Sequence, residues 1–202
     1  DHLVTGGVRG FYGVHQRGGK WYGYFGGITM DRDGKTDPYL RSTKPVLYEV
    51  DFDTRAARKI GARSDDGVFR SWIIDPEGGV SATLDFISQS GSWSIRNGAG
   101  QKIEMGNSKL GGVDLVGIGS AGGTLIYSRT DDDSGADHWF EVPFDGGEAK
   151  EILDDVEVER RFFDRRSGRF IGYTVSGDVP AYHFFDARQQ KIMNATLKAF
   201  SG

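Results

Sequence analysis

Short apolar runs alternate with turn residues along most of the chain. In its central part four such runs follow one another: VDLVGIG, TLIYSRT, HWFEVPF and AKEILDD (113–119, 124–130, 138–144 and 149–155). The segments between them, SAGG, DDDSGAD and DGGE, are dominated by glycine and acidic residues. Runs of this length that are rich in β-branched and aromatic residues and bounded by turn residues are typical of β-strands. The pattern therefore predicts a unit of four short strands.

The unit recurs along the sequence. A turn glycine followed by a strand-like run occurs at Gly79, Gly123 and Gly168, at intervals of 44 and 45 residues. Gly19 begins the same pattern 60 residues before Gly79, and we assign the extra length to a polar loop insertion at 31–44 (DRDGKTDPYLRSTK). A repeat of this period is typical of architectures built from one supersecondary unit.

A second marker follows the same period. An aromatic residue is followed two positions later by a β-branched or aromatic residue, at intervals of 45, 47 and 42 residues: Tyr48/Val50, Trp93/Ile95, Phe140/Val142 and Tyr182/Phe184. Four strands in about 45 residues are typical of a β-propeller blade, whose two apolar faces must be covered by neighbouring blades. We therefore predict an all-β fold, a β-propeller of about four four-stranded blades. The chain would form a single propeller domain or segment over 1–202, with blades at approximately 8–63, 64–108, 109–155 and 156–188.

One segment is predicted to be helical. In QQKIMNATLKAF (189–200) the apolar residues Ile192, Met193, Leu197 and Phe200 recur at roughly helical spacing without an internal glycine. Asp186 is placed to cap this helix. A short C-terminal helix would interrupt the blade pattern.

Four blades make either a closed four-bladed propeller or part of a larger one. No sequence feature indicates closure, such as a terminal strand that completes the first blade. Unpaired strand edges and an uncovered apolar sheet face favour association. We favour an origin in a longer chain, and we expect self-association if these residues are expressed alone as a fragment.

Composition narrows the choice of partners. The net charge of −4 and the lack of a basic cluster argue against nucleic acid. No apolar run approaches the roughly 18 residues that a membrane span requires. Without any cysteine, disulfides, thiol catalysis and cysteine–metal sites are excluded. This composition suits the bacterial cytoplasm and the periplasm equally, so the localisation stays open.

Two blocks of the sequence carry a family resemblance. RRFFDRRSGRFIGYTVSGDVPAYHFFDARQQKIMNATLKAF (160–200) and FRSWIIDPEGGVSATLDF (69–86) resemble the N-terminal β-propeller region of bacterial prolyl oligopeptidase-family serine peptidases. The pattern is an aspartate, a turn glycine, an apolar strand, an aromatic–aromatic–Asp strand and a glutamine-rich helix start. These are Asp164, Gly168, 170–173, 184–186 and 189–190. The resemblance covers the second to fourth units well and the first loosely.

The resemblance implies a role without catalysis. In that family the propeller covers the mouth of a C-terminal α/β-hydrolase domain and filters peptide substrates by size. The catalytic residues belong to the hydrolase domain, so the resemblance assigns none here. The G-x-S-x-G elbow of that domain has no match, because GIGSAG (117–122) carries Ile118 where the first glycine should be. The implied partners are the hydrolase domain and a peptide.

Several motifs have a structural interpretation that is simpler than a functional one. GIGSAG also matches G-x-G-x-x-G, but a strand follows it instead of the helix that holds a pyrophosphate, so we interpret it as a β-turn. Two acidic loops offer carboxylates that could bind a cation. One contains Asp131, Asp132, Asp133 and Asp137, and the other contains Asp31, Asp33 and Asp37. For both we favour a solvated loop over a metal site. His2, His15, His138 and His183 are scattered over separate units, and His138 and His183 occupy comparable strand positions. We therefore predict neither a metal nor a cofactor.

Five residues are candidate peptide contacts. Arg160, Arg161 and Arg165, in the run EVERRFFDRR, are placed to meet a peptide carboxylate. Trp21 and Tyr22, beside Tyr24 and Phe25, are placed to grip a peptide. The simpler interpretations are a strand with solvated ends and packing between blades.

Three hypotheses for the function follow. The first is a non-catalytic propeller module of a prolyl oligopeptidase-like serine peptidase that gates or recognises peptides. The alternative is a stand-alone TolB-like propeller that acts as a binding scaffold for proteins. The third, a sialidase-like or glycosidase-like propeller enzyme, is disfavoured because the aspartate box around Asp133 is imperfect. Its tryptophan, Trp139, falls one place late, and the first serine is absent.

Overall fold

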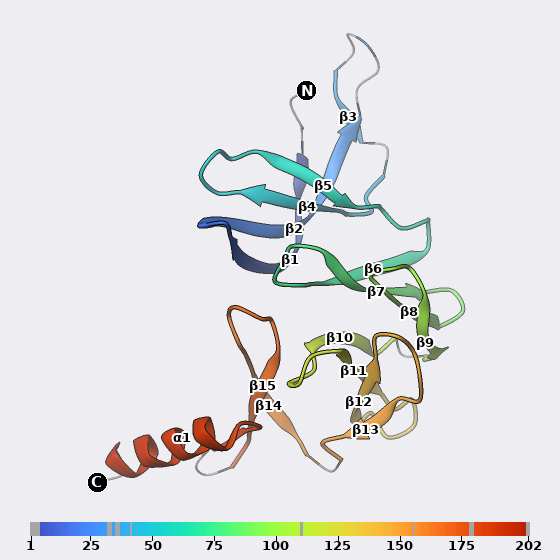
Figure 1. Cartoon of the computed structure of the whole chain (residues 1–202). Helices are drawn as coiled ribbons and strands as arrows, with labels where there is room; N and C mark the ends of the chain where they lie inside the picture. Colours follow the sequence, from blue (N-terminus) through green and yellow to red (C-terminus); the bar gives the residue numbers. More distant parts are fainter. Residues whose placement is uncertain are drawn as a thin grey trace.

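The computed structural model describes residues 5–31, 34, 37–40, 42–109, 111–154, 156–177 and 180–200, without the side chains of residues 5, 6 and 31. These residues form four antiparallel sheets and one C-terminal helix (Figure 1). The predicted all-β fold with four blade-like sheets is confirmed.

Within each sheet the strand order follows the sequence. Sheet 1 contains β1 (Thr5–Arg17), β2 (Lys20–Asp31), β4 (Val46–Asp51) and β5 (Ala57–Gly61), and the short β3 (Tyr39–Leu40) pairs with the end of β2. Sheet 2 contains β6 (Val68–Ile74), β7 (Val80–Ile87), β8 (Ser92–Asn97) and β9 (Lys102–Asn107). Sheet 3 contains β10 (Val113–Ile118), β11 (Thr124–Thr130), β12 (Asp137–Pro143) and β13 (Lys150–Ile152). Sheet 4 contains β14 (Val158–Phe163), β15 (Phe170–Val175) and β16 (Ala181–Phe184), and the helix α1 (Ala187–Phe200) follows.

The two sequence markers identify the second and third strands of every sheet. The glycines Gly19, Gly79, Gly123 and Gly168 stand one or two residues before β2, β7, β11 and β15. The aromatic pairs lie in β4, β8, β12 and β16. Both markers therefore report one structural repeat.

Aspartates close the hairpins between strands. Asp131 Oδ1 accepts hydrogen bonds from the backbone N–H groups of Asp133 and Ser134, at 3.1 and 2.7 Å. Asp164 Oδ1 accepts the equivalent pair from Arg166 and Ser167. The segment 131–137 is thus a hairpin loop organised by its first carboxylate. Likewise GIGSAG contains the end of β10 and the turn that leads to β11, and a strand follows it, as predicted.

Consecutive sheets pack face to face. Tyr24 and Leu47 of sheet 1 pack with Trp72 and Ile74 of sheet 2. Leu84, Trp93 and Ile95 of sheet 2 pack with Leu125, Tyr127 and Val142 of sheet 3. Val116, Ile126 and Trp139 of sheet 3 pack with Phe170 of sheet 4. Each large apolar side chain buried in this way stabilises the fold by roughly 1.5–3 kcal/mol, so the stacking of blades supplies the core.

The structure departs from an ideal repeat at both ends. Sheet 4 contains three strands where the other sheets show a fourth. Helix α1 begins at Ala187, two residues before the predicted start, and the predicted cap is confirmed, because the Gln189 N–H donates to Asp186 Oδ1 at 2.9 Å. In the predicted loop insertion, β3 extends sheet 1, and Asp33 lies outside the described residues. His2 also lies outside them.

Sheet 4 comes back towards the first two sheets at the middle of the molecule. A carbon added to Gly168 in the position of a Cβ would lie 3.9 Å from His15 Cε1 and from the carbonyl oxygen of Ile74. Among the described residues no helix has the length and apolar character that crossing a membrane requires.

Candidate functional site

The first strands of the four sheets converge on one hollow. Figure 1 shows β1, β6 and β10 towards the middle of the molecule, and the hairpin of β14 and β15 reaches up towards them. A pocket of about 500 Å³, here called the axial pocket, is lined by residues 11–15, 71–74, 114–117, 163–165 and Gly168. All four sheets therefore contribute to a single site.

Each of these inner strands is irregular where it reaches the pocket. The pairing register shifts between Phe11 and Val14 in β1, between Ile73 and Ile74 in β6, and between Leu115 and Gly117 in β10. In β14 the shift lies between Phe162 and Phe163. Such bulges bend a strand, redirect its side chains and are common next to functional sites. The regular ladders thus end in shaped backbone around the axial pocket.

His15 is the most deeply buried titratable group of the pocket wall. Its side chain is 7% exposed, and its ring centroid lies 5.5 Å from that of Tyr24. Its Nδ1 has no hydrogen-bond partner among the described residues. Burial lowers the pKa of His15, although the charges of Asp75 and Glu77 work in the opposite direction. The pocket wall therefore contains an imidazole whose burial favours the neutral form and whose Nδ1 is unpartnered among the described residues.

Two glycines let the fourth sheet approach the axis. A Cβ on Gly117 would lie 2.7 Å from the ring of Phe163, so a side chain at this position would push that ring away. Gly168 has a φ of 64°, in the left-handed region that other residues avoid. The wall formed by Phe163 and the β14–β15 turn depends on both.

A charge network around the buried carboxylate of Glu49 fixes the end of β1 beyond His15. Glu49 accepts hydrogen bonds from Arg17 and Arg58, each at 2.9 Å, and from the Tyr24 hydroxyl at 3.0 Å. Burial works to raise the pKa of Glu49, but the hydrogen bonds from Arg58, Arg17 and Tyr24 hold it below its usual value. Burial, together with the Glu49 carboxylate, raises the pKa of Tyr24 to about 12. Arg17 also donates to the Glu77 carbonyl oxygen at 2.6 Å, which links sheet 1 to sheet 2.

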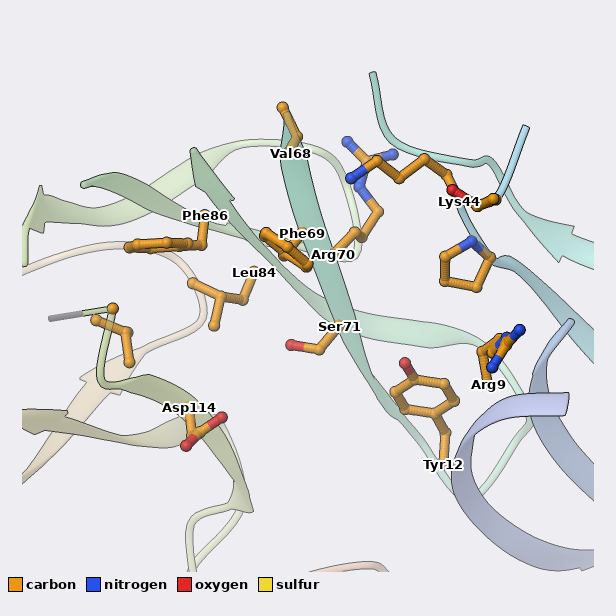
Figure 2. Close-up of a pocket in the computed structure, with 14 residues that line it drawn as sticks. Arg9, Tyr12, Lys44, Val68, Phe69, Arg70, Ser71, Leu84, Phe86 and Asp114 are labelled. Carbon is orange, nitrogen blue, oxygen red and sulfur yellow. The ribbon is translucent and has the colours of Figure 1, made fainter. Parts of the chain in front are cut away.

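A second hollow adjoins the axial pocket. This cleft of about 640 Å³, here called the rim cleft, shares Tyr12, Ser71 and Asp114 with the axial pocket. Figure 2 shows the hydroxyls of Tyr12 and Ser71 projecting into the space. Tyr12 and Arg9 stand on one side of it, with Leu84 and Phe86 on the other. The two hollows are therefore neighbouring parts of one recessed surface.

The rim cleft carries more positive than negative charge. Arg70 is neutralised by Asp85, through bonds of 2.6 and 2.7 Å. Lys44 lies over the ring of Phe69, with Nζ 4.6 Å from its centroid, and Arg9 is exposed. Within the described part of the chain neither Arg9 nor Lys44 has a carboxylate partner. Asp114, which is also exposed, lies on the opposite wall (Figure 2).

The five predicted peptide contacts are not brought together. Arg165 lines the axial pocket. Arg161 lies over the ring of Trp139, 5.7 Å from its centroid, between sheets 3 and 4, and Arg160 is exposed on β14. Trp21 is 49% exposed at the start of β2, and Tyr22 lies beneath Arg17. Their role in peptide binding stays a prediction, and the pocket geometry favours Arg165.

The residues that do converge were not predicted from the sequence as a group. His15, Tyr12, Ser71 and Asp114 all lie on first strands, in the segment before the turn glycine of each unit. Aligning the units on that glycine marks the first strands as one class of position. Which of their side chains face the axis depends on the bulges, which carry no clear sequence signal.

The fold defines the class of this chain, which is a stack of propeller-type blades. Comparison with known proteins does not narrow that class. No protein family model matches the chain, and no curated protein matches it. Among solved structures, TolB from Acinetobacter baumannii aligns over 81% of this chain and 45% of its own length, with 14% sequence identity and a TM-score of 0.42. The chain thus spans less than half of that structure, and a similarity this distant assigns no function.

Proposed function

We propose that this chain is a non-catalytic recognition module that binds an extended peptide segment across the rim cleft and the axial pocket. The observation that carries this proposal is the convergence of four sheets on one recessed surface with aromatic walls and hydroxyl groups. Ligand sites are typically concave and mainly apolar, with few polar groups that fix orientation.

The polar groups of the surface suit a peptide. The hydroxyls of Tyr12 and Ser71 can each donate and accept a hydrogen bond, which matches the alternating groups of a peptide backbone. The rings of Phe69 and Phe86 offer faces for apolar side chains. Neither set of contacts requires a particular sequence.

The charges suggest which peptides bind best. Arg9 and Lys44 have no carboxylate partner among the described residues, whereas Asp114 faces them across the cleft. We therefore expect a preference for segments with an acidic side chain or a terminal carboxylate at one end and a cationic group at the other. Electrostatic complementarity of this kind mainly sets specificity and the rate of association.

The setting in which the module acts is part of the proposal. The resemblance of 69–86 and 160–200 to prolyl oligopeptidase-type propellers favours a gating role beside an α/β-hydrolase domain. The alternative is a stand-alone TolB-like scaffold, in which the same surface would hold a segment of a partner protein. Sequencing the native gene around this region distinguishes them, because the first requires a G-x-S-x-G elbow downstream.

Selection from a random library of displayed ten-residue peptides tests the binding proposal. We expect enrichment of peptides with an acidic group at one end and a cationic group at the other, and the double variant Arg9→Glu/Lys44→Glu should weaken binding of the enriched peptides by about tenfold or more. The matched control is Arg188→Glu/Lys191→Glu, two exposed cations on α1 outside both hollows. Equal weakening by both double variants, or no enrichment, would count against the proposal.

A further inference from the structure

The outer edge of sheet 4 differs from the outer edges of the other sheets. In sheets 1, 2 and 3 the third strand is covered by a fourth strand, β5, β9 and β13. The third strand of sheet 4, β16, has no fourth strand beside it in the described residues. An open strand edge presents unpaired backbone groups, so something else must satisfy them.

Gln190 of α1 meets those groups. The Phe184 N–H donates to Gln190 Oε1 at 2.6 Å, and Gln190 Nε2 donates to the Tyr182 carbonyl oxygen at 3.0 Å. A side-chain amide has the same donor and acceptor as a backbone peptide group. A neighbouring antiparallel strand would bond the same two residues of β16, exchanging both N–H and C=O with each of them. Gln190 therefore occupies a place that suits a fourth strand.

The sequence around Gln190 matches that of a fourth strand. YHFFDARQQKI (182–192) aligns without a gap to WSIRNGAGQKI (93–103), every residue lying 89 positions after its counterpart. The aligned segment of sheet 2 comprises most of β8, its turn and the start of β9. It ends in QKI, as does the segment of sheet 4. The start of α1 thus shares the tripeptide QKI with the segment that enters β9, where Lys102 and Ile103 are the first two residues of the strand.

The turn residues explain why a helix forms in sheet 4. In sheet 2 the turn relies on Gly98 and on Gly100, which has a φ of 81°. Ala187 and Gln189 stand at these positions in sheet 4. Non-glycine residues avoid positive φ, and alanine, arginine and glutamine favour helices. With Asp186 as its cap, the segment is therefore biased towards α1.

The helix is held by few contacts of its own. None of its residues is buried, and Ile192 is 57% exposed. The counterpart of Ile192 in sheet 2, Ile103, is 8% exposed and packs with Trp93 and Ile95. In the strand register Ile192 would accordingly join Tyr182 and Phe184, which stack with Phe162 on one face of sheet 4.

We infer that residues 191–194, the counterparts of 102–105 in β9, are an alternative fourth strand of sheet 4, which exchanges with the N-terminal half of α1 at the edge of β16. The helical form leaves the backbone edge capped by one side chain. The strand form completes the blade and extends its apolar face with Ile192. This inference is independent of the peptide-binding proposal, because it concerns a different edge of the molecule.

Restoring the turn glycines tests the inference. The double variant Ala187→Gly/Gln189→Gly places glycine at the position that has a positive φ in the turn of sheet 2. Because glycine adopts this conformation without strain, the population of the strand form should rise by about tenfold. The matched control, Ala195→Gly/Thr196→Gly, places two glycines in the same helix beyond the aligned segment. Because α1 has no buried residue, neither variant should disturb sheets 1–3, as the amide spectrum of β7 to β12 will show.

NMR distinguishes the outcomes. For the turn variant we expect extended-type Cα and Cβ chemical shifts at 191–194 and nuclear Overhauser contacts between Met193 and Phe184, the pair that corresponds to Glu104 and Ile95. For the control we expect loss of helical shifts without these contacts. Random-coil shifts at 191–194 in both variants would overturn the inference, and so would persistence of the helix in the turn variant.

Discussion

His15 shows how one buried residue connects stability to the axial pocket. Its imidazole is enclosed by the first strands, and burial favours the neutral form. A neutral ring with an unpartnered Nδ1 can accept or donate one hydrogen bond, depending on its tautomer. This atom is buried, and its hydrogen-bonding capacity is unused among the described residues.

We expect His15→Gln to make the stability less dependent on pH. The folded protein has a pKa for His15 below 6.5, so the unfolded chain takes up a proton first as the pH falls. The stabilising contribution is complete above about 6.5 and declines below it. Urea unfolding between about pH 5 and 7.5 should show a shallower slope in the variant.

His138 provides the control of opposite sign. Its hydrogen bond with Glu151, at 2.5 Å, raises the pKa of His138. Its contribution is therefore present below about 6.5 and lost as the pH rises through the folded-state value. His138→Gln should reduce stability on the acidic side only. The same pH profile in both variants would contradict this account.

Glu49 should be the most sensitive charged residue of sheet 1. Glu49→Gln removes the carboxylate that pairs with Arg17 and Arg58, and we expect a loss of about 1–3 kcal/mol in the free energy of unfolding. The lower end allows for solvent screening, because the Arg58 side chain is 66% exposed. Chemical denaturation measures the loss. Glu159→Gln, at an exposed position of β14, is the control and should change stability by less than about 0.5 kcal/mol.

At the scale of elements, the hairpins follow local rules that can be read from the sequence. Asp51, Asp131 and Asp164 each accept backbone hydrogen bonds two and three residues ahead. The next residue is in the left-handed region: Arg55, Gly135 and Gly168, with φ of 60°, 72° and 64°. Arg55 is the non-glycine residue among these three, so the left-handed conformation is strained at its position.

Exchanging glycine and non-glycine residues at this turn position tests the rule. Arg55→Gly should stabilise the protein by about 0.5–1 kcal/mol, since it relieves the left-handed strain. Gly135→Ala should destabilise it by about 1 kcal/mol, since nothing lies near the added methyl group and strain is the main effect. Equilibrium unfolding measures both changes. Equal effects of the same sign would show that the loops do not share this conformation.

Strand identities were predictable from the sequence, whereas the site was not. Gly79 and Trp93 mark second and third strands because a turn glycine and an aromatic position recur in each unit. The helix after β16 was predicted from the spacing of its apolar residues, whereas the capping of the β16 edge by Gln190 was not, because it depends on where the helix begins. The axial pocket depends on bulges such as that at Leu115, which arise from the packing of several strands and leave no local signature.

At the scale of the whole molecule, sheet 1 has an open apolar face. Phe11 and Phe52 are 63% and 44% exposed, and Phe25 links them with ring centroids 5.5 and 6.5 Å away. In sheets 2 and 3 the corresponding faces are covered by a neighbouring sheet. Exposed patches of this kind favour association.

We expect the chain to self-associate through this face when it is expressed alone. Phe11→Ser/Phe52→Ser should shift the molecular mass measured by light scattering towards that of a monomer. Phe200→Ser, at an 85% exposed position of α1, is the control and should leave the mass unchanged. A monomeric wild-type chain would show that the exposed apolar face of sheet 1 does not drive self-association.

The convergence of the four sheets on one axis is best tested by a single contact. His15 Cε1 and Gly168 belong to the first and last sheets, and they meet at the wall of the axial pocket. A nuclear Overhauser spectrum should show a cross-peak between the His15 Hε1 proton and an α-proton of Gly168. If both resonances are assigned and the cross-peak is missing, the fourth sheet does not return to the axis, and the shared pocket does not exist.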